Sequence, residues 1–201
     1  MGSLVLYRHM RSAENQRTSR RLLLGGVAGP AAFVAAWVIG GAVAEGYSPV
    51  EDPISRLAAV GATTRPLMTA GFLGFGAGMT AFAGGLRTSL AGRAWGAALA
   101  AGACTVGVAA VPLDGGRDDL HGVLAGLGYA ALVAVPALAA RPLARAHRGH
   151  AAVATVVAAV AAACLLASAT TSGPDGLLQR LGLTTVDAWI AVTALRLWRR
   201  L

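Results

Sequence analysis

One carboxylate in this sequence lies where a charge is costly and where it could do chemistry. Asp187 falls near the middle of the last apolar run, between residues 181–186 and residues 188–195. An anion at such a depth in a membrane costs several kcal/mol if it faces lipid, so we expect Asp187 to face the interior of a helix bundle. Helical spacing predicts that Arg180 and Thr184 share its stripe. The carboxyl group could donate or relay a proton, or it could serve only as a hydrogen-bonding group between helices.

Most of the other acidic residues fall in three loops between apolar runs, at residues 45–57, 114–121 and 172–176. Like carboxylates grouped at the mouths of apolar helices raise one another's pKa, and a general acid that works near neutral pH needs a raised pKa. These acids could equally be solvated loop charges, and a histidine among them could be an ordinary residue of a helix start. The candidates for proton transfer are Glu51, Asp52, Asp114, His121 and Asp187.

A second set of residues could shape a substrate pocket beneath these loops. Aromatic faces attract cations, although aromatic residues in membrane spans more often pack against neighbours or anchor a helix at the interface. The candidates for substrate binding are Trp37, Tyr47, Ser55, Phe72, Trp95, Tyr129, Gln179, Arg180, Thr184 and Trp189.

Several familiar chemistries have no motif here. The sequence lacks a phosphate-binding Walker loop, a G-x-S-x-G nucleophile elbow, an H-E-x-x-H zinc motif and a D-D-x-x-D metal-diphosphate motif. Cys104 and Cys164 lie inside apolar runs, with no cysteine or histidine spacing typical of a metal site. We therefore expect no metal and no cofactor.

The composition is that of an integral membrane protein. Hydrophobic residues make up 56% of the chain and charged residues 13%, whereas a soluble domain is about 25% charged. The net charge of +8 includes no lysine, and the arginines cluster at the ends of apolar runs. Such flanking arginines are typical of membrane topology rather than of a nucleic-acid surface.

Six apolar runs are long enough to cross a bilayer, which takes about 17–25 residues. We expect spans near Leu22–Ala44, Pro66–Leu86, Ala94–Leu113, Gly122–Ala140, Ala151–Thr171 and Leu177–Leu197. Short loops predict an all-α, up-and-down six-helix membrane bundle over residues 22–201, preceded by a basic cytoplasmic tail at residues 1–21. Pro49 and Pro53 exclude a continuous helix through the first acidic loop.

The arginines predict the orientation. Thirteen of the seventeen lie in the N-terminal tail, the turns at residues 86–93 and 141–150, and the C-terminus. Positive residues stay inside, so both termini should be cytoplasmic in the plasma membrane, with the acidic loops outside. Glycines four residues apart (Gly25/Gly29, Gly74/Gly78, Gly122/Gly126) favour close helix packing within the bundle over a dimer seam, and the oligomeric state stays open.

Short motifs near the ends of the runs resemble the family named domain of unknown function 998. They are Tyr47-Ser48, Ile54-Ser55-x-Leu57, Val111-Pro112-x-Asp114, Leu120-His121 and Gly176-Leu177-x-Gln179-Arg180. The resemblance runs from the first span to the last and implies a small bacterial protein of about six spans, but it supplies no function. The family often has Phe-Pro where this chain has Val111-Pro112, and Asp187 has no place in the family pattern.

More loosely, the chain is similar to small bacterial membrane-bound terpene cyclases, which are metal-free and start cyclisation with a carboxylic acid. This resemblance implies an enzyme that cyclises or isomerises a lipophilic prenyl or terpenoid substrate, with Asp52, Asp114 or Asp187 as the proton donor. The alternative is a non-catalytic membrane protein, either a small-solute or proton-coupled transporter or an accessory scaffold. In both cases the expected partners are the lipid bilayer and a small molecule, and not nucleic acid.

Overall fold

The computed structural model describes residues 14–170 and 173–201, and in this part of the chain every regular element is a helix. Residues 14–23 are helical and lead through a turn at Leu24 into the first long helix. The helices are α2 (Gly25–Val43), α3 (Arg65–Ser89), α4 (Ala94–Ala110), α5 (Asp118–Ala144), α6 (Arg148–Thr170) and α7 (Asp175–Trp198), with a short 3-10 helix η1 (Ile54–Ala58). All six predicted helices are therefore present.

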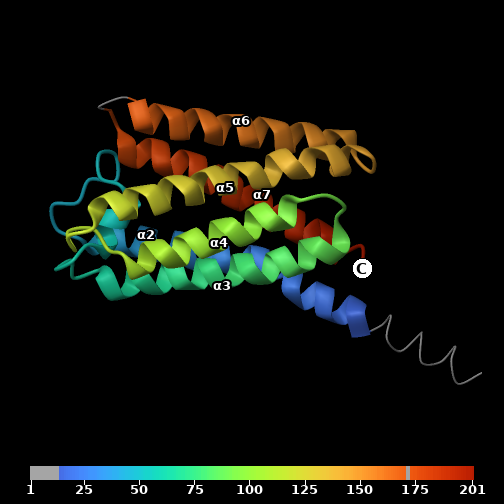
Figure 1. The fold of residues 1–201 in the computed structure, drawn as a ribbon, viewed down its shortest axis with the longest axis horizontal. Coiled ribbons are helices and arrows are strands. Elements are labelled where there is room, and N and C mark those ends of the chain that lie inside the picture. The colour runs from blue at the N-terminus through green and yellow to red at the C-terminus, as the bar shows by residue number, and fades with distance from the viewer. Residues whose placement is uncertain (1–13, 171–172) are drawn as a thin grey trace, which may run out of the picture.

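Consecutive helices lie side by side along one long axis, and α7 closes the bundle by packing against α2, α5 and α6 (Figure 1). The predicted boundaries are close to the observed ones. α4 ends at Ala110 instead of Leu113 because Pro112 cannot donate a helical hydrogen bond. The helix at the N-terminus reaches at least to residue 14, inside the predicted tail. The rest of that tail and the predicted span end at Thr171 lie outside the described residues.

Within the described residues, four helical segments are long and apolar enough to cross a membrane: Glu14–Val43, α3, α5 and α6. α4 has 17 residues, or about 26 Å, which is slightly short of a hydrocarbon core of about 30 Å. α7 has 24 residues but is less apolar, because it carries Gln179, Arg180 and Asp187. The chain is thus a membrane-type helical protein, and the count of six spans remains a prediction.

Glycines bring α2 and α3 into backbone contact. A Cβ added at Gly78 would lie 2.5 Å from the Cα of Gly29 and 2.7 Å from the carbonyl oxygen of Gly25. The predicted tight packing is therefore confirmed for this seam, where small residues allow close approach. It is wrong for Gly122 and Gly126, since a Cβ at either position would meet no atom within 4 Å.

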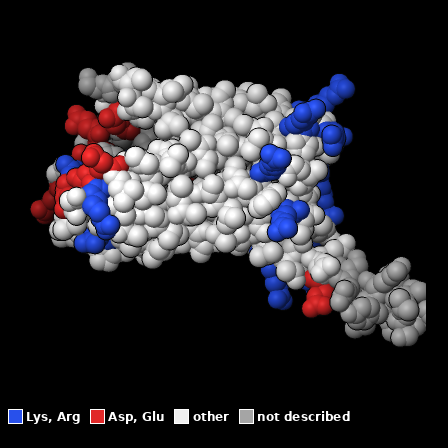
Figure 2. Space-filling view, in the orientation of Figure 1, with Lys and Arg blue, Asp and Glu red and all other residues white. Residues whose placement is uncertain are grey.

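Charge separates along the bundle axis (Figure 2). The acidic side chains gather at the end formed by the three predicted acidic loops, beside a few arginines, and most of the other arginines lie toward the opposite end. We call these the acidic end and the basic end. The predicted grouping of the acidic loops on one face is confirmed, and the assignment of the basic end to the cytoplasm remains a prediction from the arginine count.

Candidate functional site

The acidic end is closed by the loop between α2 and α3, residues 44–64. Its prolines prevent a long helix, so its polar backbone groups need other partners. Asp52 fixes the first turn, because its Oδ2 accepts a hydrogen bond from the amide of Ser48 at 2.8 Å. The hydroxyl of Thr64 donates to the carbonyl of Leu57 at 2.8 Å. Between these points η1 buries Ile54 and Leu57 in the bundle.

Arg180, near the start of α7, holds this loop in place. Its Nη1 donates to the carbonyls of Pro49 (2.8 Å), Asp52 (3.0 Å) and Gly176 (2.8 Å). Only 8% of the residue is exposed. No carboxylate among the described residues lies within ion-pair distance of it. Backbone carbonyls rather than a carboxylate therefore surround the charge of Arg180, and its Nε has no partner among the described residues.

Tyr47 and Trp37 complete the surroundings of the guanidinium. Arg180 Nη2 donates to the hydroxyl of Tyr47, and the guanidinium carbon lies 5.4 Å from the ring centroids of both Tyr47 and Trp37. Burial raises the pKa of the Tyr47 hydroxyl above its usual value, and the neighbouring Arg180 opposes this rise only in part. Tyr47 is therefore a neutral donor, and its hydroxyl donates to the carbonyl of Pro53 at 3.3 Å.

Gly176 lets the loop approach α7. A Cβ at this position would overlap the carbonyl oxygen of Asp52 and lie 2.7 Å from that of Pro49. One turn further, Gln179 Oε1 accepts a hydrogen bond from the amide of Ile54 at 2.7 Å. The Gly176-Leu177-x-Gln179-Arg180 motif is thus the part of α7 that fastens the loop.

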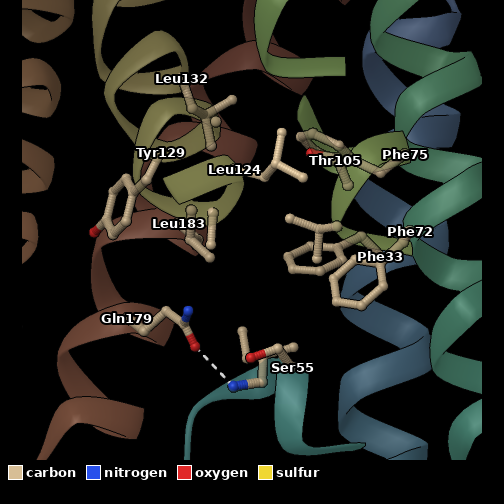
Figure 3. Close-up of a pocket in the computed structure, with 14 residues that line it drawn as sticks. Phe33, Ser55, Phe72, Phe75, Thr105, Leu124, Tyr129, Leu132, Gln179 and Leu183 are labelled. Atoms are coloured by element: carbon tan, nitrogen blue, oxygen red, sulfur yellow. Dashed lines mark hydrogen bonds between the residues drawn. The ribbon is translucent and has the colours of Figure 1, made fainter. Parts of the chain in front are cut away.

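A cavity of about 70 Å³ lies directly beneath this fastening, among α2, α3, α4, α5, α7 and η1. The rings of Phe33, Phe72 and Phe75 form one side, and leucines from α5 and α7 form the other (Figure 3). Ser55 and Gln179 lie at the end nearest η1 (Figure 3). The cavity therefore has an aromatic wall and a polar end, and none of its lining residues is a carboxylate.

Tyr129 lines this cavity with its ring, while its hydroxyl points away from the aromatic wall (Figure 3). The hydroxyl lies over Gly182 of α7, where an added Cβ would overlap it and would lie 3.0 Å from the Cβ of Cys164. The oxygen is buried and has no hydrogen-bond partner among the described residues. Gly182 therefore makes the space into which Tyr129 fits.

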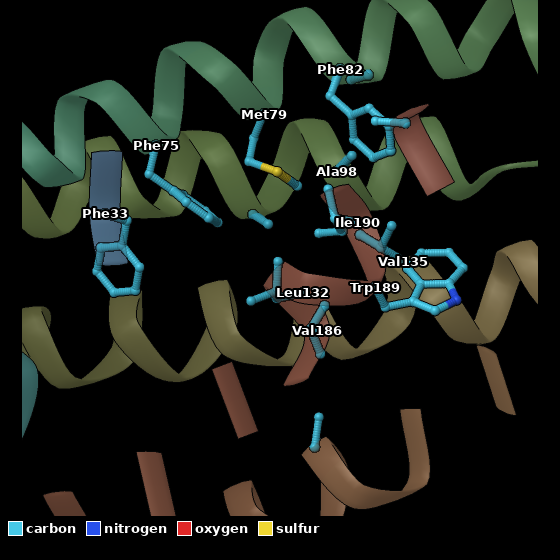
Figure 4. Close-up of a cluster of buried hydrophobic side chains, with 14 of the residues drawn as sticks. Phe33, Phe75, Met79, Phe82, Ala98, Leu132, Val135, Val186, Trp189 and Ile190 are labelled. Carbon is cyan, nitrogen blue, oxygen red and sulfur yellow. The ribbon is translucent and has the colours of Figure 1, made fainter. Parts of the chain in front are cut away.

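Asp187 lies deeper in the bundle, one helical turn beyond the cavity-lining residue Leu183. It is 2% exposed, and neither carboxylate oxygen has a hydrogen-bond partner among the described residues. Its neighbours in α7, Val186 and Ile190, belong to the apolar cluster that includes residues of α3 and α5 (Figure 4). The expectation that Asp187 faces the bundle interior is confirmed, whereas its role as an acid stays a prediction.

The remaining acids do not converge on the cavity. Glu51 and Asp114 are exposed, and Asp114 forms an ion pair with Arg56 at 3.0 Å. His121 is 3% exposed and its Nδ1 lies 2.5 Å from the carbonyl oxygen of Val111, so it ties the start of α5 to the end of α4. These positions fit loop and packing roles, and no described contact joins any of them to Asp187.

The predicted binding residues divide into three places. Ser55, Phe72, Tyr129 and Gln179 line the cavity, and Trp37, Tyr47 and Arg180 form the anchor of the loop. The others lie elsewhere: Trp95 packs under Arg87, with the guanidinium carbon 5.3 Å from its ring, and Trp189 lies beside His150 at 5.9 Å between ring centroids.

The predicted stripe of Arg180, Thr184 and Asp187 is wrong at Thr184, which is exposed. Seven residues make two turns, so Arg180 and Asp187 share a face, but a residue four positions from Arg180 and three from Asp187 can still fall at the edge of that face. The cavity also uses residues that the sequence did not single out for binding, chiefly Phe33, Leu132 and Leu183. Only their apolar periodicity signals them, and that signal is the same for any core residue.

Comparison with known proteins identifies the family of the chain. No curated protein and no solved structure matches the chain, so the looser resemblance to terpene cyclases has no support from these comparisons. The family model described as protein of unknown function (DUF998) matches residues 27–196. That range includes the loop anchor, the whole cavity lining and Asp187. The chain therefore belongs to the DUF998 family.

Proposed function

We propose that this chain is a membrane-embedded binding protein for a small lipophilic molecule that carries one polar group. The observation that supports this proposal is the cavity beneath the α2–α3 loop, with three phenylalanine rings on one side and Ser55 and Gln179 at its end. Ligand sites typically combine apolar walls with a few placed polar groups. The apolar part of the ligand would contact Phe33, Phe72 and Phe75, and its hydroxyl or carbonyl would lie at Ser55 and Gln179.

The size of the cavity limits the ligand. Its volume is about 70 Å³, whereas a cavity of about 150 Å³ holds benzene and sites for drug-sized ligands are roughly 300–1,000 Å³. The cavity therefore accepts a small solute or one end of a longer amphiphile. A fifteen-carbon prenyl chain would not be enclosed, which argues against cyclisation of such a chain inside this cavity.

The test uses thermal unfolding of the purified protein in detergent, with geraniol as the probe, of which only the hydroxyl end would enter the cavity. The comparison compound is 2,6-dimethyloctane, which lacks the hydroxyl and the double bonds. Geraniol at saturating concentration should raise the melting temperature by about 5–10 °C, because a ligand at 100 times its Kd stabilises by about 2.7 kcal/mol. Ala125→Phe fills the cavity from α5 and should abolish the shift. Ser55→Ala should reduce it, and the alkane should give a smaller one. An equal shift in wild type and Ala125→Phe would contradict the proposal.

A second candidate is acid-initiated isomerisation or cyclisation of the bound molecule, and the buried, unpartnered carboxyl group of Asp187 favours it. Ionisable residues inside a membrane bundle often belong to proton-transfer sites. Asp187 lies about 6 Å along the helix from Leu183, so the cavity must extend by one turn before the carboxyl can reach a ligand atom. The same carboxyl group could carry the proton of a proton-coupled transporter.

Two assays separate these functions. Purified protein is incubated with a prenylated indole, with and without EDTA, and the products are analysed by mass spectrometry. An enzyme should form a product that EDTA does not suppress and that Asp187→Asn abolishes without lowering the melting temperature. A transporter should form no product in detergent but should acidify sealed vesicles in the presence of its solute. Unchanged product formation by Asp187→Asn would remove Asp187 from the proposed acid role.

A further inference from the structure

A surface groove of about 640 Å³ runs between α6 and α7 at the basic end. Its rim carries His147, Arg148 and Arg196, and its wall includes Val153, Trp189 and Val192. The groove thus begins at charged residues and continues along the apolar part of two helices. It is separate from the cavity beneath the α2–α3 loop, because the two share no lining residue.

A buried histidine holds one of the rim arginines. Arg196 Nη1 lies 2.5 Å from His150 Nδ1, and His150 Nε2 lies 3.0 Å from the hydroxyl of Thr193. A guanidinium can only donate hydrogen bonds, so Nδ1 accepts from Arg196 and the proton of the ring is on Nε2, which donates to Thr193. This arrangement uses one nitrogen of Arg196, which is otherwise exposed at the groove.

The positive charge of the rim is not neutralised by the protein. Neither Arg148 nor Arg196 has a carboxylate within ion-pair distance among the described residues. The acidic loops lie at the opposite end of the bundle (Figure 2), and Asp187, nine residues before Arg196 in α7, is buried. The groove is open at Gly149, between Arg148 and His150, where an added Cβ would meet no atom within 4 Å.

We propose that this groove binds an anionic phospholipid of the bilayer. The phosphate of the headgroup would lie between Arg148 and Arg196, and one acyl chain would follow the exposed Val153 and Val192, above the buried Trp189. The charge complementarity favours an anionic headgroup over a zwitterionic one, because a basic pocket between membrane helices attracts negative lipid. The apolar wall favours a lipid over a free phosphate, because only a lipid has a chain to cover it.

Trp189 provides a probe from beneath the groove, because it lines the groove while only 5% of the residue is exposed. A variant with Trp37→Phe, Trp95→Phe and Trp198→Phe keeps Trp189 as its single tryptophan. It is reconstituted in phosphatidylcholine vesicles that contain brominated phosphatidylglycerol or brominated phosphatidylcholine at equal mole fraction. Bromine quenches tryptophan at short range, so a brominated chain bound in the groove quenches Trp189 from above. Brominated phosphatidylglycerol should bind with a relative affinity about tenfold above that of brominated phosphatidylcholine.

Variants of the rim test the charges. Arg196→Gln and Arg148→Gln should each reduce the preference for the anionic lipid roughly fivefold. Arg148 is exposed and makes no described side-chain hydrogen bond, so its variant tests the proposal even if loss of the Arg196–His150 contact affects folding. Arg141→Gln is the control, since it removes the same charge at the same end outside the groove.

The outcomes are distinct. Equal quenching by the two brominated lipids would overturn the proposal, and so would an Arg141→Gln effect as large as that of Arg148→Gln, because the attraction would then be a general property of the basic end. A preference that is lost only in the rim variants supports it. None of these results depends on the ligand of the cavity.

Discussion

Arg180 and Asp187 are both buried, both lie on α7 and are seven residues apart, yet their surroundings are opposite. Arg180 donates hydrogen bonds to three carbonyls and to the hydroxyl of Tyr47. Asp187, about 10 Å further along the helix, has no hydrogen-bond partner among the described residues. The buried Arg180 is thus part of the architecture, whereas the buried carboxyl group of Asp187 has no structural partner among the described residues.

The difference follows from the backbone around each residue. The α2–α3 loop contains Pro49 and Pro53 and has little regular structure, so its carbonyls need donors from elsewhere. Arg180 supplies these hydrogen-bond donors. Around Asp187 the neighbouring segments are long helices, whose amides and carbonyls already pair within each helix. A polar side chain at that depth therefore has no unpaired backbone group with which to form a hydrogen bond.

The largest expected effect is the loss of the Arg180 anchor. Arg180→Met keeps an unbranched side chain but leaves the carbonyls of Pro49 and Asp52 without this donor in a buried site. Hydrogen bonds to a charged group contribute about 1.5–3 kcal/mol each, so we expect a loss of at least about 3 kcal/mol. Thermal unfolding in detergent should show a melting temperature lower by roughly 6–12 °C.

Arg117→Met is the matched control, because Arg117 is an exposed arginine at the same end. It should change the stability by less than about 0.5 kcal/mol. Arg180→Lys should fall between the two, since an ammonium keeps the charge but cannot reach several carbonyls and Tyr47 at once. If Arg180→Met and Arg117→Met melt at the same temperature, Arg180 is not a structural anchor.

A smaller effect is expected at Gly182, which lies between the two charges on α7. Gly182→Ala places a methyl group where the Tyr129 hydroxyl lies, and such overpacking costs about 1–3 kcal/mol. Tyr129→Phe removes that hydroxyl, so the double variant should recover about 1 kcal/mol relative to the sum of the single variants. Thermal unfolding of the three variants measures this coupling.

The control for this cycle is Gly126→Ala, in the open face of α5. Alanine there has free space and a better helix propensity, so the stability should rise by about 0.5–1 kcal/mol. Additive effects of Gly182→Ala and Tyr129→Phe would show that the two residues do not share a space.

The sequence predicts the helices and the charge separation well, because both depend on local patterns. Apolar runs place all six helices within a few residues, and the prolines of residues 45–57 predict the interruption that the structure shows. The position of Asp187 inside an apolar run is enough to predict its burial. These properties can be predicted without knowing which helices pack against each other.

The candidate site is predicted only in part, because it depends on contacts between distant segments. Gln179 meets Ile54 across 125 residues of sequence, and no local pattern encodes that pair. The sequence groups Trp95 and Trp189 with Phe72 as pocket residues, but aromatic type alone does not reveal which end of the bundle a ring faces. The sequence predicts that the acids of the loops act near a pocket, whereas Asp52 stabilises a turn and Asp114 pairs with Arg56.

The substitution with the smallest expected effect gives the clearest distinction between Arg180 and Asp187. Asp187→Leu keeps a side chain that branches at the γ position and removes two buried oxygens that have no partner. A buried polar group without a hydrogen bond is unfavourable, so its replacement by an apolar group of similar shape should be neutral or stabilising by about 1 kcal/mol. The melting temperature of Asp187→Leu should therefore equal or slightly exceed that of wild type, opposite in sign to Arg180→Met. A fall as large as that of Arg180→Met would mean that Asp187 has a structural partner, and the contrast between the two residues would be lost. Retained stability leaves function as the reason for an acid at this depth, because a carboxyl group that does not support the fold is unfavourable to bury.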